Sequence, residues 1–154
     1  VRALYAIGTQ LYVGGIFTSP YTRIALYNTT TQTWSSIGGS LNNRVNSLCM
    51  IGTQLYVGGD FTSPYSYIAL YNTVTQVWSS IAGSLNGSVY TLCAIGTQLY
   101  VGGIFTSPYS YIALYNTATQ SWSSIGGSLN SFVYALCAIG TQLYVGGAFS
   151  SPYS

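Results

Sequence analysis

The chain has 154 residues, of which 49% are hydrophobic and 3% are charged, and its formal net charge is +2. Its charged residues, Arg2, Arg23, Arg44 and Asp60, form no basic stripe for nucleic acid, and no apolar run reaches the roughly 18 residues of a membrane span. With one carboxylate side chain and no histidine, the chain lacks a base for catalysis, so we expect no enzyme activity and no catalytic residues.

The chain repeats itself along its whole length. The phrase Ile-Gly-Thr-Gln-Leu-Tyr-Val-Gly-Gly recurs every 44 residues, beginning at Ile7, Ile51, Ile95 and Ile139. A fixed period of this size is typical of solenoids, propellers and arrays. We therefore expect three full units and a half unit within one domain or part of one, at residues 1–44, 45–88, 89–132 and 133–154.

Each unit contains four short segments rich in Val, Ile, Tyr, Phe, Thr and Trp, bounded by clusters of Gly, Pro, Asn and Ser. This composition and spacing predict strands, and no stretch has helical periodicity over ten or more residues. In the second unit the predicted strands are Val45–Ile51, Gln54–Phe61, Tyr67–Asn72 and Val77–Ile81.

The predicted turns and faces of these strands favour one architecture. Gly52 stands at the first central position of a two-residue connection, which suits a type II′ hairpin, and Pro64 marks the loop between the second and third strands. Leu55 and Tyr56 are both apolar but face opposite sides of their strand, so we expect burial on both faces. Four-stranded antiparallel blades stacked radially make an all-β fold, a β-propeller, with 3.5 blades in this chain.

A double glycine, then a tyrosine, then six residues and a tryptophan resemble kelch-type blades. The pattern has three copies: Gly14, Gly15, Tyr27 and Trp34; Gly58, Gly59, Tyr71 and Trp78; and Gly102, Gly103, Tyr115 and Trp122. Longer phrases, such as LYVGGDFTSP and IALYN, are similar to the propellers of fungal cortical polarity markers and galactose-oxidase-like proteins. The resemblance implies a propeller fold and leaves function open. The copper chemistry of galactose oxidase needs histidine, which this chain lacks.

The repeated glycines and tryptophans have structural explanations. We expect the paired glycines to give backbone room at the crowded inner end of a blade or to adopt a positive φ. The resemblance implies that the tryptophans pack between blades, and a sugar-stacking platform is the alternative.

Three cysteines, Cys49, Cys93 and Cys137, share one position of the first strand, where the first unit has Tyr5. Equivalent positions on a ring suit neither a disulfide nor a metal site, so we expect small buried side chains and no metal or other cofactor.

Positions that differ between the units border one rim, that of the loops joining strands two to three and four to one. We interpret this rim as a candidate ligand-binding surface, and drift in tolerant loops is the alternative. Its aromatic and amide groups suit a neutral glycan or a protein partner. The candidate residues are Arg23, Arg44, Asn46, Asp60, Tyr67, Tyr90, Tyr111 and Tyr134.

A half blade leaves an open edge that must be covered. Two chains supply seven units, so we consider a homodimer first, although strands three and four of one blade would be missing, and a longer repeat array is the alternative. Two function classes follow: a non-enzymatic structural or assembly scaffold, and a multivalent lectin-like module. The low charge and the glycosylation sequons at Asn28 and Asn86 slightly favour an extracellular, virion or cell-surface location, while the cysteines favour a reducing compartment.

Overall fold

The computed structural model describes residues 1–127 and 129–151, and over these residues the protein has fourteen strands and no helix. The first sheet contains β1 (Ala3–Ile7), β2 (Gln10–Gly14), β3 (Ile24–Asn28) and β4 (Thr33–Ser35). The second contains β5 (Val45–Ile51), β6 (Gln54–Gly59), β7 (Ile68–Asn72) and β8 (Val77–Ser79). The third contains β9 (Val89–Ile95), β10 (Gln98–Gly103), β11 (Ile112–Asn116) and β12 (Ser121–Ser123). A final hairpin contains β13 (Val133–Ile139) and β14 (Gln142–Gly147).

Neighbouring strands in each sheet pair antiparallel in sequence order, so each sheet is an up-and-down meander. The predicted all-β fold of four-stranded antiparallel blades is confirmed. We call the three complete sheets blades 1 to 3 and the final hairpin the half blade. Residues 152–154, which the sequence assigned to the half blade, lie outside the described residues.

Three predicted strands of blade 2 are one or two residues too long. The strand predicted at Gln54–Phe61 ends at Gly59, because Phe61 leaves the ladder and is buried in the core between blades. The next strand begins at Ile68 and excludes Tyr67, whose φ of 63° is incompatible with an extended strand.

The fourth strand of blade 2 was predicted to reach Ile81 but ends at Ser79. Ile81 and Leu85 are buried, and they belong to a segment that leaves blade 2 to pack under blade 3. We call this segment and its equivalents the linkers; they comprise residues 37–41, residues 81–85 and, within the described residues, 125–127 and 129. A linker therefore joins two blades through packing as well as through the chain.

The hairpin between the first two strands has the predicted type II′ turn. Ile51 pairs with Gln54, and Gly52 has a φ of 60° while Thr53 has no positive φ. This combination distinguishes type II′ from type I′, in which both central residues have positive φ.

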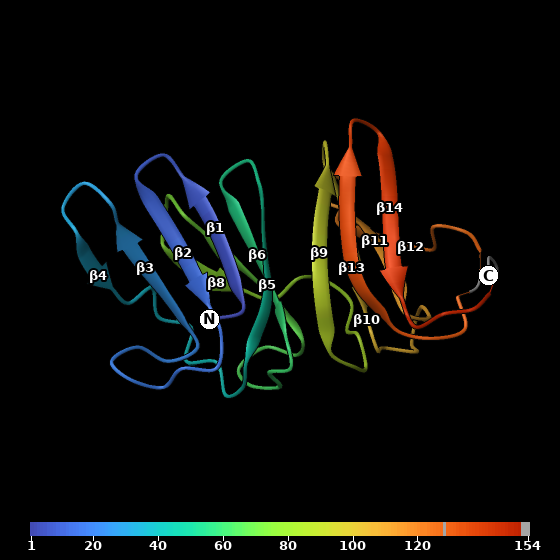
Figure 1. The fold of residues 1–154 in the computed structure, drawn as a ribbon, viewed down its shortest axis with the longest axis horizontal. Coiled ribbons are helices and arrows are strands. Elements are labelled where there is room, and N and C mark those ends of the chain that lie inside the picture. Colours follow the sequence, from blue (N-terminus) through green and yellow to red (C-terminus); the bar gives the residue numbers. More distant parts are fainter. Residues whose placement is uncertain (128, 152–154) are drawn as a thin grey trace.

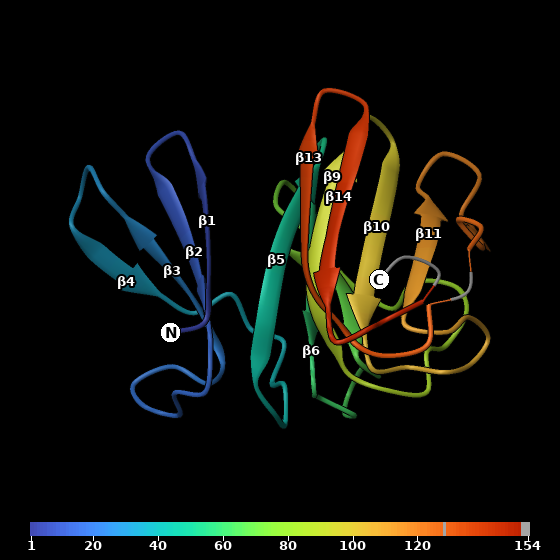
Figure 2. The ribbon, with the colours of Figure 1, turned by 45° about the vertical axis from the view of Figure 1, so that its right-hand side comes forward.

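The blades stack side by side with their first strands adjacent. Contacts join β1 to β5, β5 to β9 and β9 to β13, and Figure 2 shows β5, β9 and β13 next to one another. The three and a half blades form an open arc, with β4 and the half blade at its opposite ends (Figure 1). The arc leaves one face of blade 1 and one face of the half blade without a neighbouring blade.

Candidate functional site

The first glycine of each pair lies where two blades approach most closely. A Cβ added to Gly58 would lie 2.5 Å from Cγ1 of Val89, the first residue of the next blade. Gly14 and Gly102 have the same relationship to Val45 and Val133. None of these glycines has a positive φ, so the lack of a side chain matters here because of contact between blades.

The second glycine of each pair faces the start of its own blade. A Cβ on Gly59 would collide with the carbonyl oxygen of Arg44, and one on Gly103 with that of Ser88. Gly59 also donates its N–H to the carbonyl of Tyr67 at 2.9 Å. The pair therefore closes a blade on one side and admits the next blade on the other.

Tryptophans of the fourth strands lie against the linker of the preceding blade. Trp78 donates its indole N–H to the carbonyl oxygen of Ile37 at 2.7 Å, and its ring covers Gly39. Trp122 donates its indole N–H to the carbonyl oxygen of Ala82, one residue beyond the position equivalent to Ile37, and its ring covers Gly83. These two indoles consequently join neighbouring blades.

Trp34 has no preceding blade and is 49% exposed. Its ring packs on Tyr27, with ring centroids 4.9 Å apart, and on Tyr21. The rings of Trp34 and Tyr21 border an apolar hollow of about 290 Å³ that Val1 and Val13 also line. This hollow occupies the face that a preceding linker would cover.

Sequence reasoning missed a set of asparagines that brace each linker to the loop of the next blade. The side-chain oxygen of Asn86 accepts the N–H groups of Thr106 and Ser107, at 2.8 and 2.9 Å. Its side-chain nitrogen donates to Oγ1 of Thr106, so this sequon nitrogen serves a structural bond. The sequence signal was the asparagine that directly follows the last leucine of every linker. Asn42 and Asn130 make equivalent bonds.

The starts of the first strands surround a polar pocket of about 480 Å³. Its lining residues come from all three blades and from the half blade: Arg2, Arg44, Asn46, Tyr90 and Tyr134. Tyr90 and Tyr134 stack with their ring centroids 5.8 Å apart. Four of the eight candidate rim residues therefore meet here, and Arg2, at the position equivalent to Asn46, joins them.

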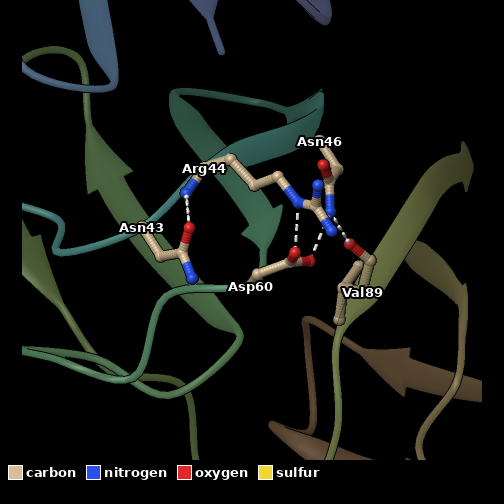
Figure 3. A network of polar contacts seen from close by, with 5 residues as sticks. All are labelled: Asn43, Arg44, Asn46, Asp60 and Val89. Carbon is tan, nitrogen blue, oxygen red and sulfur yellow. Dashed lines mark hydrogen bonds and ion pairs between the residues drawn. The ribbon is translucent and has the colours of Figure 1, made fainter. Parts of the chain in front are cut away.

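Asp60 lies beside this pocket and binds two of its lining residues, Arg44 and Asn46. Its carboxylate accepts from Nε of Arg44 in an ion pair and from the side-chain nitrogen of Asn46 at 2.7 Å (Figure 3). The same nitrogen of Asn46 donates to the carbonyl of Val89, at 3.0 Å, and so links blade 2 to blade 3. Within the described residues the buried side-chain oxygen of Asn46 has no hydrogen-bond partner.

The remaining candidates lie apart from the pocket lining. Tyr111 meets Phe132 edge-on, with centroids 5.9 Å apart, and Phe132 in turn contacts Tyr134. Arg23 and Tyr67 hold the turn before the third strand, with φ values of 64° and 63°. Nη1 of Arg23 donates to the carbonyl of Ile16, so its charged group is directed to the backbone of its own loop.

The cysteines become more exposed along the chain. Cys49 is buried, Cys93 is half-buried and Cys137 is exposed, because blade 3 covers the first and the half blade the second. The expectation of three buried thiols is therefore wrong for Cys137, whose covering blade is missing. Burial, with a smaller contribution from Cys93, raises the pKa of Cys49 to about 11.

In residues 1–127 and 129–151, no three His, Cys, Asp or Glu side chains lie together in a way that would hold a metal ion. No helix in the same residues is long and apolar enough to cross a membrane.

Stacked four-stranded antiparallel blades define the class: this is a partial β-propeller built from one repeated unit. The chain belongs to the family described as Rax2 C-terminal beta propeller domain, which matches residues 42–131. The expected likeness to the propellers of fungal cortical polarity markers is thereby confirmed, and the kelch-like detail stays a prediction.

Solved structures with the same fold include two computationally designed proteins. Ika4 has a TM-score of 0.65 at 14% identity, over 97% of this chain and 88% of Ika4. Ika8 has a TM-score of 0.63 at 14% identity, over 94% of this chain and 42% of Ika8. At these identities the likeness concerns fold alone. No curated protein matches the chain.

Proposed function

We propose that this protein is a non-enzymatic structural scaffold whose propeller ring is completed by further blades of the same repeat. Self-association or additional repeats would supply those blades. Catalysis plays no part, because the one carboxylate side chain of the sequence, Asp60, is held by Arg44 and Asn46.

One observation carries this proposal: the two ends of the arc expose complementary halves of an interface that the chain makes twice internally. Internal linkers bury Ile37 and Ile81 beside Trp78 and Trp122. At the ends, Trp34 lacks a linker, and Ile125 is 37% exposed, whereas Ile37 is 9% exposed. Exposed apolar surfaces of this kind mark interaction sites.

Native mass spectrometry across a concentration series tests the proposal. We expect a species with the mass of two chains at high concentration and of one chain at low concentration. A single chain mass at all concentrations, with one cooperative unfolding transition, would contradict assembly.

The polar pocket favours a second candidate function, which is recognition of a neutral glycan. Stacked phenol rings of Tyr90 and Tyr134 offer an apolar platform, and Arg2 and Arg44, which line the same pocket, offer donors for hydroxyl groups. A glycan array tests this candidate. Binding that is lost in Tyr90→Ala and Tyr134→Ala but kept in Tyr67→Ala would support it, and no binding to the array would contradict it.

We also propose an extracellular or cell-surface location. The near absence of charge supports this location, since Ser, Thr, Asn and Gln carry most of the polar surface. Fractionation of the source cells, followed by detection of the protein, tests the location directly.

A further inference from the structure

The two ends of the chain carry nearly the same hairpin. β2 and the first five residues of β14 have the same sequence, Gln-Leu-Tyr-Val-Gly. Each hairpin packs against a neighbour on one side, since β1 contacts β5 and β13 contacts β9. Val1 is accordingly 72% exposed while its equivalent, Val133, is fully buried. One hairpin placed between blades 3 and 2 could make both sets of contacts.

The half blade leaves a notch where its third and fourth strands would lie. Within the described residues, β14 pairs with β13 and its other edge is open. The notch has a volume of about 590 Å³, and its walls include Ile125 and Leu129 of the last linker and Tyr144 of β14. In blade 2 the equivalent space is filled by β7, β8 and Trp78.

The other end of the chain offers strands of the required kind. β3 repeats the Ile-Ala-Leu-Tyr-Asn sequence of β7, and β4 presents the half-exposed Trp34. β3 pairs with β2 in a register from Gln10–Asn28 to Gly14–Ile24. Because β14 has the sequence of β2, it offers the same residues for that register.

We propose that two copies of this chain associate by strand exchange, and this inference rests on the proposed scaffold function. In each junction, the β13–β14 hairpin of one copy displaces the β1–β2 hairpin from β3 of the other copy. Residues 1–22 leave the sheet, and the hybrid blade consists of β13 and β14 from one chain and β3 and β4 from the other. Two reciprocal exchanges close a ring of six blades, within the usual range of four to eight.

Strand exchange conserves strand pairing and adds burial of apolar surface. A strand of the same sequence replaces its counterpart in the same register, so the cost is low, as in domain swapping. The gain is that Trp34 enters the notch against Ile125 and Leu129, as Trp78 lies against the linker of blade 1. Apolar surface exposed at both ends of each arc is thereby removed from water.

The surroundings of two glycines differ between the single chain, in which the β1–β2 hairpin stays paired with β3, and the exchanged dimer. In the single chain, a Cβ on Gly14 would lie 2.5 Å from Cγ1 of Val45, whereas a Cβ on Gly146 meets only Ala135, at 3.9 Å. After exchange these environments reverse, because β14 takes the place of β2 beside blade 2. Gly146 then faces Val45 of the second copy, and Gly14 is released with its hairpin.

Sedimentation equilibrium of the wild type, Gly146→Ala and Gly14→Ala tests the exchange. We expect Gly146→Ala to raise the dimer dissociation constant by about tenfold or more, as overpacking does, and Gly14→Ala to lower it. Equal constants for all three proteins, or shifts in the opposite directions, would overturn the exchange. A wild type that stays monomeric would overturn the exchange and self-association together, whereas association unaffected by either glycine would overturn the exchange alone.

Labelling of the unmodified chain gives a second readout that needs no variant. Dimerisation should slow the alkylation of Cys137, since blade 2 of the second copy covers it as blade 3 covers Cys49. Amides of residues 3–14 should exchange with deuterium faster in the dimer than in the monomer. A dimer in which Cys137 stays reactive and residues 3–14 stay protected would contradict strand exchange.

Discussion

The indole nitrogen of Trp78 lies 2.7 Å from the carbonyl oxygen of Ile37, so a side chain of blade 2 holds the linker of blade 1. The same ring lies against Gly39, where a Cβ would approach its atoms to 2.8 Å. One residue thus combines a hydrogen bond with close packing across a blade boundary.

Trp78→Ala should lower the free energy of unfolding by about 3 kcal/mol, the lower end of the cost of removing a large ring from a core, because Trp78 is half-buried against that core. The matched control is Trp34→Ala, which should cost less than about 1 kcal/mol in dilute solution because half of that side chain is exposed. Urea unfolding followed by circular dichroism measures both. Equal losses for the two variants would show that the Trp78 contact does not hold the blades together.

Gly58→Ala should destabilise the protein by about 1–3 kcal/mol, because its Cβ would overlap Cγ1 of Val89. Gly146→Ala, at the equivalent position of the half blade, should be nearly neutral in the monomer because it has no following blade. Thermal melts at low protein concentration compare the two. A neutral Gly58→Ala would contradict the proposed tight contact between blades.

The blades and hairpins could be predicted from the sequence, whereas the ends of several strands could not. The 44-residue period and the Gly-Thr turns predicted the blades and hairpins, because local residue types determine them. Strand ends such as Gly59 were missed, since the burial of Phe61 between blades is a tertiary effect.

The candidate pocket was predicted in part for a similar reason. Positions 46, 90 and 134 are equivalent in the repeat and differ in residue type between units. Because each lies at the start of the first strand of its blade, and these strand starts lie next to one another, the three side chains line one pocket. Sequence could not show that Arg23 turns back to Ile16, because that bond depends on the path of its loop.

Asn86→Ala should lower stability by about 1 kcal/mol, the net contribution of a typical hydrogen bond, because two backbone N–H groups lose their acceptor. Asn86→Asp keeps the acceptor oxygen and should lose less. Hydrogen exchange of the Thr106 and Ser107 amides reports the brace directly. Unchanged protection of both amides in Asn86→Ala would rule out this role.

Arg44→Ser should cost about 1–2 kcal/mol, because it leaves the largely buried Asp60 without its cation. The chain itself supplies the control, since blade 3 has Ser88 and Ile104 at the two equivalent positions. The double variant Arg44→Ser with Asp60→Ile should recover most of the loss. A double variant that is less stable than Arg44→Ser would refute this explanation of the pair.

Stability should fall as the pH rises above about 9, because burial raises the pKa of Cys49 from 9.0 to about 11 and that of Tyr56 from 10.0 to about 12. Below pH 9 both groups are protonated in the folded and unfolded chain. At higher pH the unfolded chain loses these protons first, so unfolding releases protons and becomes more favourable. Urea unfolding from pH 7 to 11 measures the fall, and Cys49→Ala should reduce its slope between pH 9 and 11. A stability that rises with pH in this range would contradict the burial of both groups.

Native mass spectrometry of the unmodified chain over a concentration series tests the central claim, that the open arc is completed by another copy of the same repeat. The account predicts a concentration-dependent mass of two chains, with Cys137 less reactive in that species. A monomer at every concentration, with Cys137 equally reactive throughout, would contradict it.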